Sequence, residues 1–213
     1  MEESKTNQKS GAIIRDLTEG SVIKLLLIFA APLFVSNLLQ AVYNIVDMMV
    51  IGQVIGGTGM SAVATGGNVL NMLTFLAMGF SGAGQVLIAR FVGEDDKDAI
   101  KKAIGTMFTL LLSMAIIMTI VCFFVRDGIL HLVNTPEEAY DLTMDYTIVC
   151  VLGLVFIYGY NIVSAILRGM GDSKRPFYFV AVATVVNIVL DIVFVVYLNM
   201  SAMGAALATV IGQ

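Results

Sequence analysis

The chain has 213 residues, of which 58% are hydrophobic and only 13% are charged, and its formal net charge is −4. A soluble domain of this size carries roughly 25% charged residues, so the composition indicates an integral membrane protein. The net charge is small and negative, and no basic cluster with interleaved aromatic residues is present. Both observations argue against a nucleic-acid partner.

Apolar runs long enough to cross a bilayer follow a polar N-terminal tail, residues 1–20, in chain order. A helix needs about 20 residues to cross roughly 30 Å of hydrocarbon. The predicted spanning helices cover residues 24–51, 60–91, 99–125, 139–167 and 176–198, and a sixth, 201–213, is expected to be truncated. Continuous runs without strict alternation favour an all-α bundle over a barrel of strands.

The basic residues fall almost entirely on one side of these predicted helices. All but one of the twelve Lys and Arg residues lie in the N-terminal segment, the second-to-third connection or the fourth-to-fifth connection, and only Arg126 lies on the opposite side. The positive-inside rule places the basic side in the cytoplasm. We therefore predict a multi-pass protein of the cell inner (plasma) membrane with a cytoplasmic N-terminus.

Two acidic residues lie within the apolar runs: Asp47 in the first span and Asp191 in the fifth. An aspartate near the centre of a spanning helix costs about 2.5–3.5 kcal/mol, so such residues usually face a bundle interior or a cavity. At about 1.5 Å per residue, both fall in the outer half of the membrane at comparable depth. They could share one cavity; alternatively, each could lie near the outer interface and reach water there.

Polar residues accompany both aspartates at helical spacing, so each set shares one helix face. They are Asn37, Gln40, Tyr43 and Asn44 in the first span, Thr184 and Asn187 in the fifth, and Thr209 at a similar depth in the sixth. Interhelical hydrogen bonding could explain the amides and hydroxyls. It explains two carboxylates poorly, because no embedded Lys or Arg is available. Such carboxylates either take up a proton or bind a cation such as Na⁺.

Side chains for other chemistry are sparse. His131 is the only histidine, and the two cysteines, Cys122 and Cys150, lie in apolar runs, so no zinc site or disulfide is expected. The stretch GMGD, residues 169–172, lacks the preceding strand and the spacing of a phosphate-binding loop. We predict no enzyme and no bound cofactor apart from a coupling ion, H⁺ or Na⁺.

Three stretches resemble the MATE (multidrug and toxic compound extrusion) family. They are TEGSVIKLLLIFAAPLFVSNLLQAVYNIVDMMVIG from Thr18, ILRGMGDSKRP from Ile166, and NIVLD from Asn187 together with GAALATVIGQ from Gly204. The resemblance covers almost the whole chain after residue 18. It implies one six-helix lobe of a twelve-helix transporter that exchanges Na⁺ or H⁺ for small organic, often cationic, drugs by alternating access.

The resemblance also assigns roles to residues. The proposed ion or proton site corresponds to Asp47, Asn187, Asp191 and Thr209, where Na⁺ could also bind. The expected substrate cavity comprises Asn37, Gln40, Tyr43, Asn44 and Thr184, and Pro32 is the expected hinge of the first helix. A proline that the membrane helix simply tolerates is the alternative for Pro32.

The chain length leaves several readings open. A chain that stops inside its sixth helix is expected to be an N-terminal fragment of a transporter about twice as long, and a dimerising half-transporter is the alternative. A lipid-linked oligosaccharide flippase of the same superfamily should carry Arg or Lys in its cavity for the pyrophosphate, and none is embedded here. A non-transporting membrane scaffold is the third reading.

Overall fold

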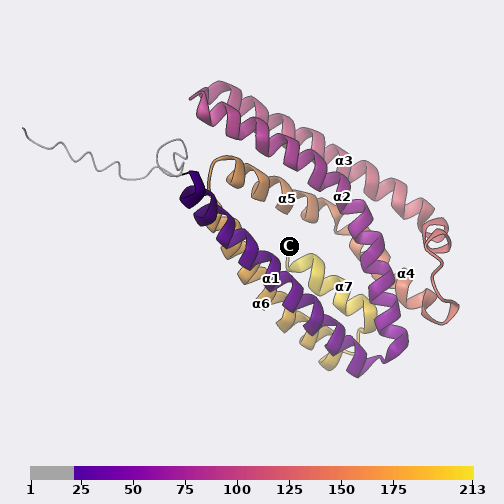
Figure 1. Cartoon of the computed structure of the whole chain (residues 1–213). Helices are drawn as coiled ribbons and strands as arrows, with labels where there is room; N and C mark the ends of the chain where they lie inside the picture. Colours follow the sequence, from indigo (N-terminus) through magenta and orange to yellow (C-terminus); the bar gives the residue numbers. More distant parts are fainter. Residues whose placement is uncertain (1–21) are drawn as a thin grey trace, which may run out of the picture.

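The computed structural model describes residues 22–213, and the predicted cytoplasmic tail, residues 1–20, lies outside the described residues. Within this range every regular element is helical, which confirms the predicted all-α fold (Figure 1). The elements are α1 (Val22–Val54), α2 (Gly57–Gly93), α3 (Lys97–Leu132), η1 (Glu137–Ala139), α4 (Tyr140–Leu152), α5 (Leu154–Gly169), α6 (Lys174–Asp191), η2 (Ile192–Tyr197) and α7 (Ser201–Ile211).

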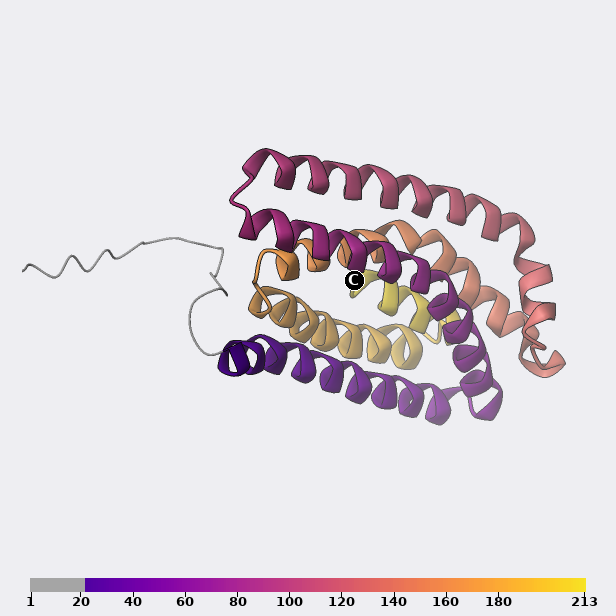
Figure 2. The same cartoon turned by 45° about the horizontal axis from the view of Figure 1, so that its top comes forward.

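The short helix α7 lies at the centre of the bundle. Figure 2 shows α1 and α6 side by side on one side, α2 and α3 on the other, and α7 between them. Helix α7 contacts α1, α2, α4 and α6. Its buried positions include Ala202, Ala205, Ala206 and Ala208, and small residues of this kind allow helix backbones to approach closely in a membrane.

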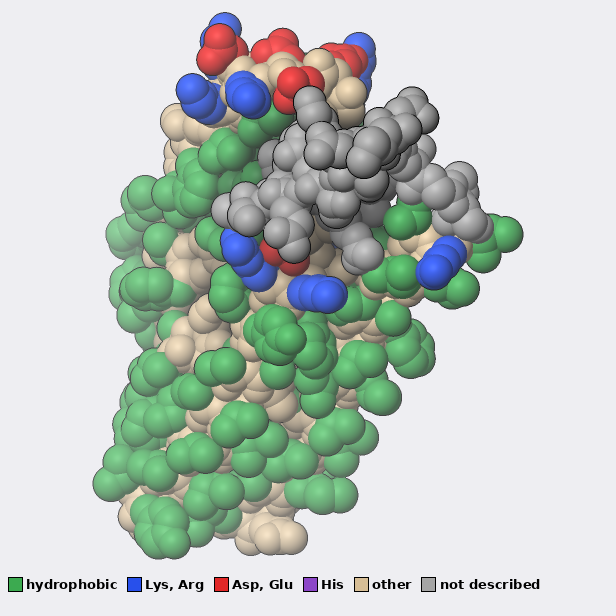
Figure 3. Space-filling model, turned by 90° about the vertical axis from the view of Figure 1, so that its left-hand side faces the viewer, with side chains coloured by type: hydrophobic (Ala, Val, Ile, Leu, Met, Phe, Trp, Pro, Cys, Tyr) green, Lys and Arg blue, Asp and Glu red, His purple; other side chains and the backbone are tan. Residues whose placement is uncertain are grey.

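Within residues 22–213, four helices are long and apolar enough to cross a membrane: Ile23–Val54, Gly57–Gly93, Lys97–Leu132 and Lys174–Tyr197. The bent pair Glu137–Leu152 and Leu154–Gly169 makes a fifth if it is counted as one span. In Figure 3 charged side chains gather at one end, and hydrophobic side chains cover most of the remaining face. An outer surface of this kind matches hydrocarbon rather than water.

The fourth predicted span is broken rather than straight. Helices α4 and α5 meet at Gly153 with a bend of 52°. The side chain of Val210 in α7 lies against Gly153, where a Cβ atom would have no room. At the same bend, Thr119 Oγ1 of α3 donates a hydrogen bond to the carbonyl of Val151 at 3.1 Å. Two features therefore account for the bend. Gly153 leaves room for the neighbouring helix α7, and the Thr119 hydroxyl bonds a backbone carbonyl at the break.

Two local features of the helices concern the predicted hinge and the predicted ion site. Helix α1 is continuous through Pro32, and Ser36 Oγ donates a hydrogen bond to the Pro32 carbonyl at 2.9 Å. In the fifth span, α6 ends at Asp191 and the backbone continues as a π-helical segment, Ile192–Tyr197. Segments of this type are rare and often mark functional sites. The hinge role of Pro32 stays a prediction.

Candidate ion and substrate site

Three helices bring the predicted ion-site residues together inside the bundle. Asp47 comes from α1, Asn187 and Asp191 from α6, and Thr209 from α7. Asp47, Asn187 and Asp191 are 6%, 5% and 0% exposed, so neither carboxylate lies on the lipid-facing surface. The spacing of four residues between Asn187 and Asp191 puts both on the same face of α6, and this face packs toward α1 and α7.

Four side-chain oxygen atoms of Asp47, Asn187 and Asp191 are buried and lack hydrogen-bond partners within the described part of the chain. The unpartnered atoms are Asp47 Oδ1, Asn187 Oδ1 and both carboxylate oxygens of Asp191. The ion pairs found among residues 22–213 join Arg90 to Glu94, Lys101 to Asp98 and Arg175 to Asp172, all outside this site. Leaving a buried polar group unpaired costs about 1–3 kcal/mol, and more for a charged one. A proton or a hard cation would supply the missing partner.

Tyr43 and Thr209 tie α1 to α7 beside the acidic pair. Their hydroxyl oxygens are 3.0 Å apart and form one hydrogen bond, in which either can be the donor. From α4, the buried residues Tyr146 and Cys150 pack on the same side of the bundle as Ile51 and Val195. The site is therefore enclosed by α1, α4, α6 and α7.

Removing the Tyr43 hydroxyl should weaken this connection between helices. We expect Tyr43→Phe to lower the free energy of unfolding by about 0.5–1.5 kcal/mol, because one partly buried hydrogen bond is lost. Thermal unfolding in detergent measures the effect. Tyr178→Phe is the matched control, since Tyr178 is 61% exposed, and equal shifts for both variants would contradict the prediction.

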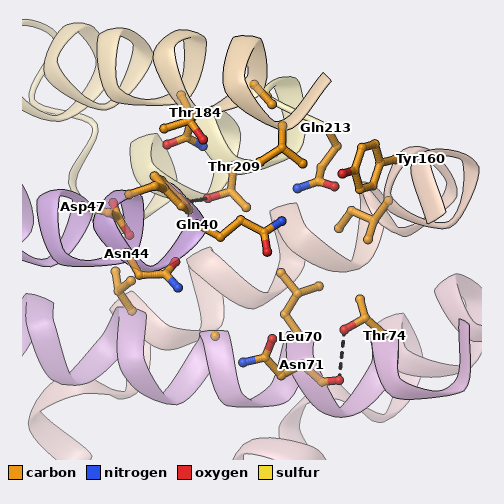
Figure 4. Close-up of a pocket in the computed structure, with 18 of the residues that line it drawn as sticks. Gln40, Asn44, Asp47, Leu70, Asn71, Thr74, Tyr160, Thr184, Thr209 and Gln213 are labelled. Atoms are coloured by element: carbon orange, nitrogen blue, oxygen red, sulfur yellow. Dashed lines mark hydrogen bonds between the residues drawn. The ribbon is translucent and has the colours of Figure 1, made fainter. Parts of the chain in front are cut away.

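A cavity of about 560 Å³ opens beside the site, within the range of drug-sized ligands. Figure 4 shows polar side chains entering it from several helices. The predicted residues that line it are Gln40, Tyr43, Asn44, Asp47, Thr184, Asn187 and Thr209. Asp191 lies buried outside the cavity lining, and Asn37 is exposed and also lies outside it.

Sequence reasoning missed a second group of cavity residues. Asn68, Asn71 and Thr74 of α2, together with Tyr160 and Asn161 of α5, line the same cavity. The α2 residues recur every three positions in an apolar run, the same signal that marked the first span. No carboxylate accompanies them in this run, so the sequence alone does not distinguish them from residues that bond neighbouring helices.

A bundle of membrane-length helices that encloses a polar cavity and a buried acidic pair is the architecture of a membrane transporter. The MatE family profile matches residues 32–193, so the chain belongs to the MATE family, as predicted. It is 33% identical over 199 residues to the "Probable multidrug resistance protein YpnP" of Bacillus subtilis (strain 168), covering 93% of this chain and 44% of that protein. The "DNA damage-inducible protein F" of Escherichia coli (strain K12) is 27% identical, at 86% and 40% coverage.

Solved structures give the same result for the fold. An outward-facing multidrug resistance MATE family transporter of the MOP superfamily superposes with a TM-score of 0.85 at 27% identity, over 91% of this chain and 43% of that one. A MOP superfamily transporter from Pyrococcus furiosus also gives 0.85 at 27% identity, over 91% and 42%. The chain spans less than half the length of the proteins it matches, and its fold corresponds to one lobe of a MATE transporter.

Proposed function

We propose that this chain forms the ion-coupling lobe of an H⁺- or Na⁺-coupled efflux antiporter for small organic, mainly cationic molecules. The observation that carries the proposal is the set of buried, unpartnered oxygens of Asp47, Asn187 and Asp191 beside a cavity of about 560 Å³. Two relatives in Bacillus subtilis are called probable multidrug resistance proteins, which supports the drug-export part of the proposal.

Asp47 is the residue through which ion and substrate would compete. Its side chain lies next to that of Asp191, its Oδ1 is buried without a partner, and it also lines the cavity. A cation in the cavity and an ion between the two aspartates would each neutralise part of the same negative charge. Repulsion between two like charges in a low-dielectric site is strong, so occupancy by one disfavours the other. Such reciprocal competition is what an antiporter needs.

The residues around the pair would define the ion site. Asn187 contributes a carboxamide oxygen, and Thr209 contributes a hydroxyl that Tyr43 holds in place. Carboxylate, carboxamide and hydroxyl oxygens can coordinate a hard cation, and they can equally relay a proton. Asp191 would be the inner ligand, since its side chain is fully buried.

Transport measurements test the proposal. The full-length protein is reconstituted in liposomes loaded with ethidium, and either a proton gradient or a Na⁺ gradient is imposed. We expect ethidium to leave faster under one of these gradients than under neither, and the accelerating gradient identifies the coupling ion. Equal rates under all three conditions would refute coupled antiport.

The residues of the cavity lining separate the proposal from a lipid-linked oligosaccharide flippase. Within the described part of the chain, the cavity lining contains amides, hydroxyls and one carboxylate, and neither Arg nor Lys. A pyrophosphate group binds best to basic side chains, so this lining disfavours a lipid-linked pyrophosphate.

In the proposed protein the lobe works in the cell membrane with its N-terminus in the cytoplasm, together with a second lobe or a second copy of the chain.

A further inference from the structure

The cavity has two chemically different walls. One wall, from α1, α6 and α7, carries Asp47 with Asn187 and Thr209. The facing wall comes from α2 and is uncharged. We define the α2 wall as Asn68, Asn71 and Thr74, which recur at three-residue spacing and so lie on one side of the helix. In Figure 4, Asn71 and Thr74 lie across the cavity from Asp47 and Asn44.

Packing of α2 does not use this wall. The helix packs against α3, α4 and α5, and its buried side includes Val69 and Leu73, which are 1% and 3% exposed. Asn68 and Asn71 are exposed instead. Within residues 22–213 the one side-chain hydrogen bond at this wall runs from the Thr74 hydroxyl to the backbone carbonyl of Asn71, at 3.0 Å, and does not involve either carboxamide.

Carboxamides without a hydrogen-bond partner in a membrane helix call for a physical explanation. A polar group without a partner is costly in hydrocarbon, and membrane helices usually use such groups to bond neighbouring helices. Here they point into a cavity whose only lining carboxylate, among the described residues, belongs to Asp47. A carboxamide both donates and accepts hydrogen bonds, so it can bind amines, hydroxyls and carbonyls alike, but it adds no charge.

We propose that the α2 wall is the specificity-determining subsite of this cavity. It binds the hydrogen-bonding groups of an organic monocation whose charge Asp47 attracts from the opposite wall. The inference rests on the proposed function and adds the substrate class: cations that carry amine, hydroxyl or carbonyl groups away from their charge. Purely lipophilic cations of the same shape bind more weakly, because they leave the amides unpaired.

A matched pair of ligands tests this directly. Ethidium carries two ring amines, and 5-ethyl-6-phenylphenanthridinium is the same cation without them. Binding of each to the full-length protein in nanodiscs is measured by isothermal titration. For Asn71→Leu we expect ethidium to bind about three- to tenfold more weakly, as one lost hydrogen bond predicts, while the deaminated cation changes less than about twofold.

Controls separate this inference from the proposed function. Met72→Leu alters the neighbouring residue of the same helix outside the cavity lining and should leave both affinities unchanged. Asp47→Asn should weaken both cations equally; if it weakens neither, the proposed function fails. Parallel losses of both cations in Asn71→Leu, or no loss of either, would overturn the α2 subsite. If the leucine variant does not fold, Asn71→Ala and Asn68→Ala give the same comparison.

Discussion

Replacing Asp191 with asparagine in the full-length protein should abolish ion-coupled efflux while leaving the fold intact. Asparagine has nearly the same shape as aspartate, but it removes the charge that attracts the coupling ion. Interactions with charged groups contribute about 1.5–3 kcal/mol each, and Asp191 offers two unpartnered oxygens, so the gradient-driven rate should fall by roughly 100-fold. The measurement is the initial rate of ethidium efflux from liposomes under the driving gradient.

Asp98→Asn is the matched control for this experiment. It makes the same chemical change at a side chain that is 85% exposed, in the first turn of α3. Its efflux rate should equal that of the unmodified protein. Normal drug export by Asp191→Asn would show that Asp191 has no part in coupling, and the proposed ion site would then be wrong.

Replacing Gly153 with isoleucine should destabilise the lobe and reduce transport together. A side chain at this position meets Val210, the residue next to Thr209 in α7, so α7 must move away from the α4–α5 bend. Overpacking of a close contact costs about 1–3 kcal/mol. Displacement of α7 would also disturb the Tyr43–Thr209 hydrogen bond beside the acidic pair.

The buried cysteines provide a way to measure this effect. Cys122 and Cys150 are both free and buried, so a thiol-reactive dye labels them only as the protein unfolds on heating. We expect Gly153→Ile to unfold at a clearly lower temperature than the unmodified protein. Gly159→Ile is the control on the same span, because a Cβ atom there meets nothing within 4 Å. Equal melting temperatures for the two variants would mean that the Gly153 contact does not hold α7.

Local chemistry was enough to predict the helices and the residues of interest within them. Long apolar runs predict spanning helices because backbone groups in hydrocarbon must bond within their own segment. Asn187 and Asp191 could be assigned to one helix face, because a spacing of four is close to one helical turn. Asp47 could be singled out because a carboxylate in an apolar run is costly whatever surrounds it.

Contacts between helices decided the rest. Periodicity defines the polar side of a helix but not the neighbour it meets, so Asn37 was grouped with the cavity residues although the structure leaves it outside the cavity. For the same reason the α2 wall was missed, and Gly153 was not recognised as a break in the fourth span.

The sequence by itself determined an all-α membrane lobe with two embedded acids. Tertiary packing decided that these acids lie together between α1 and α6 and that a second polar wall faces Asp47. The physical reason is that the cost of burying a carboxylate is a property of a single residue. The geometry of a site depends instead on distances between helices that are far apart in the chain.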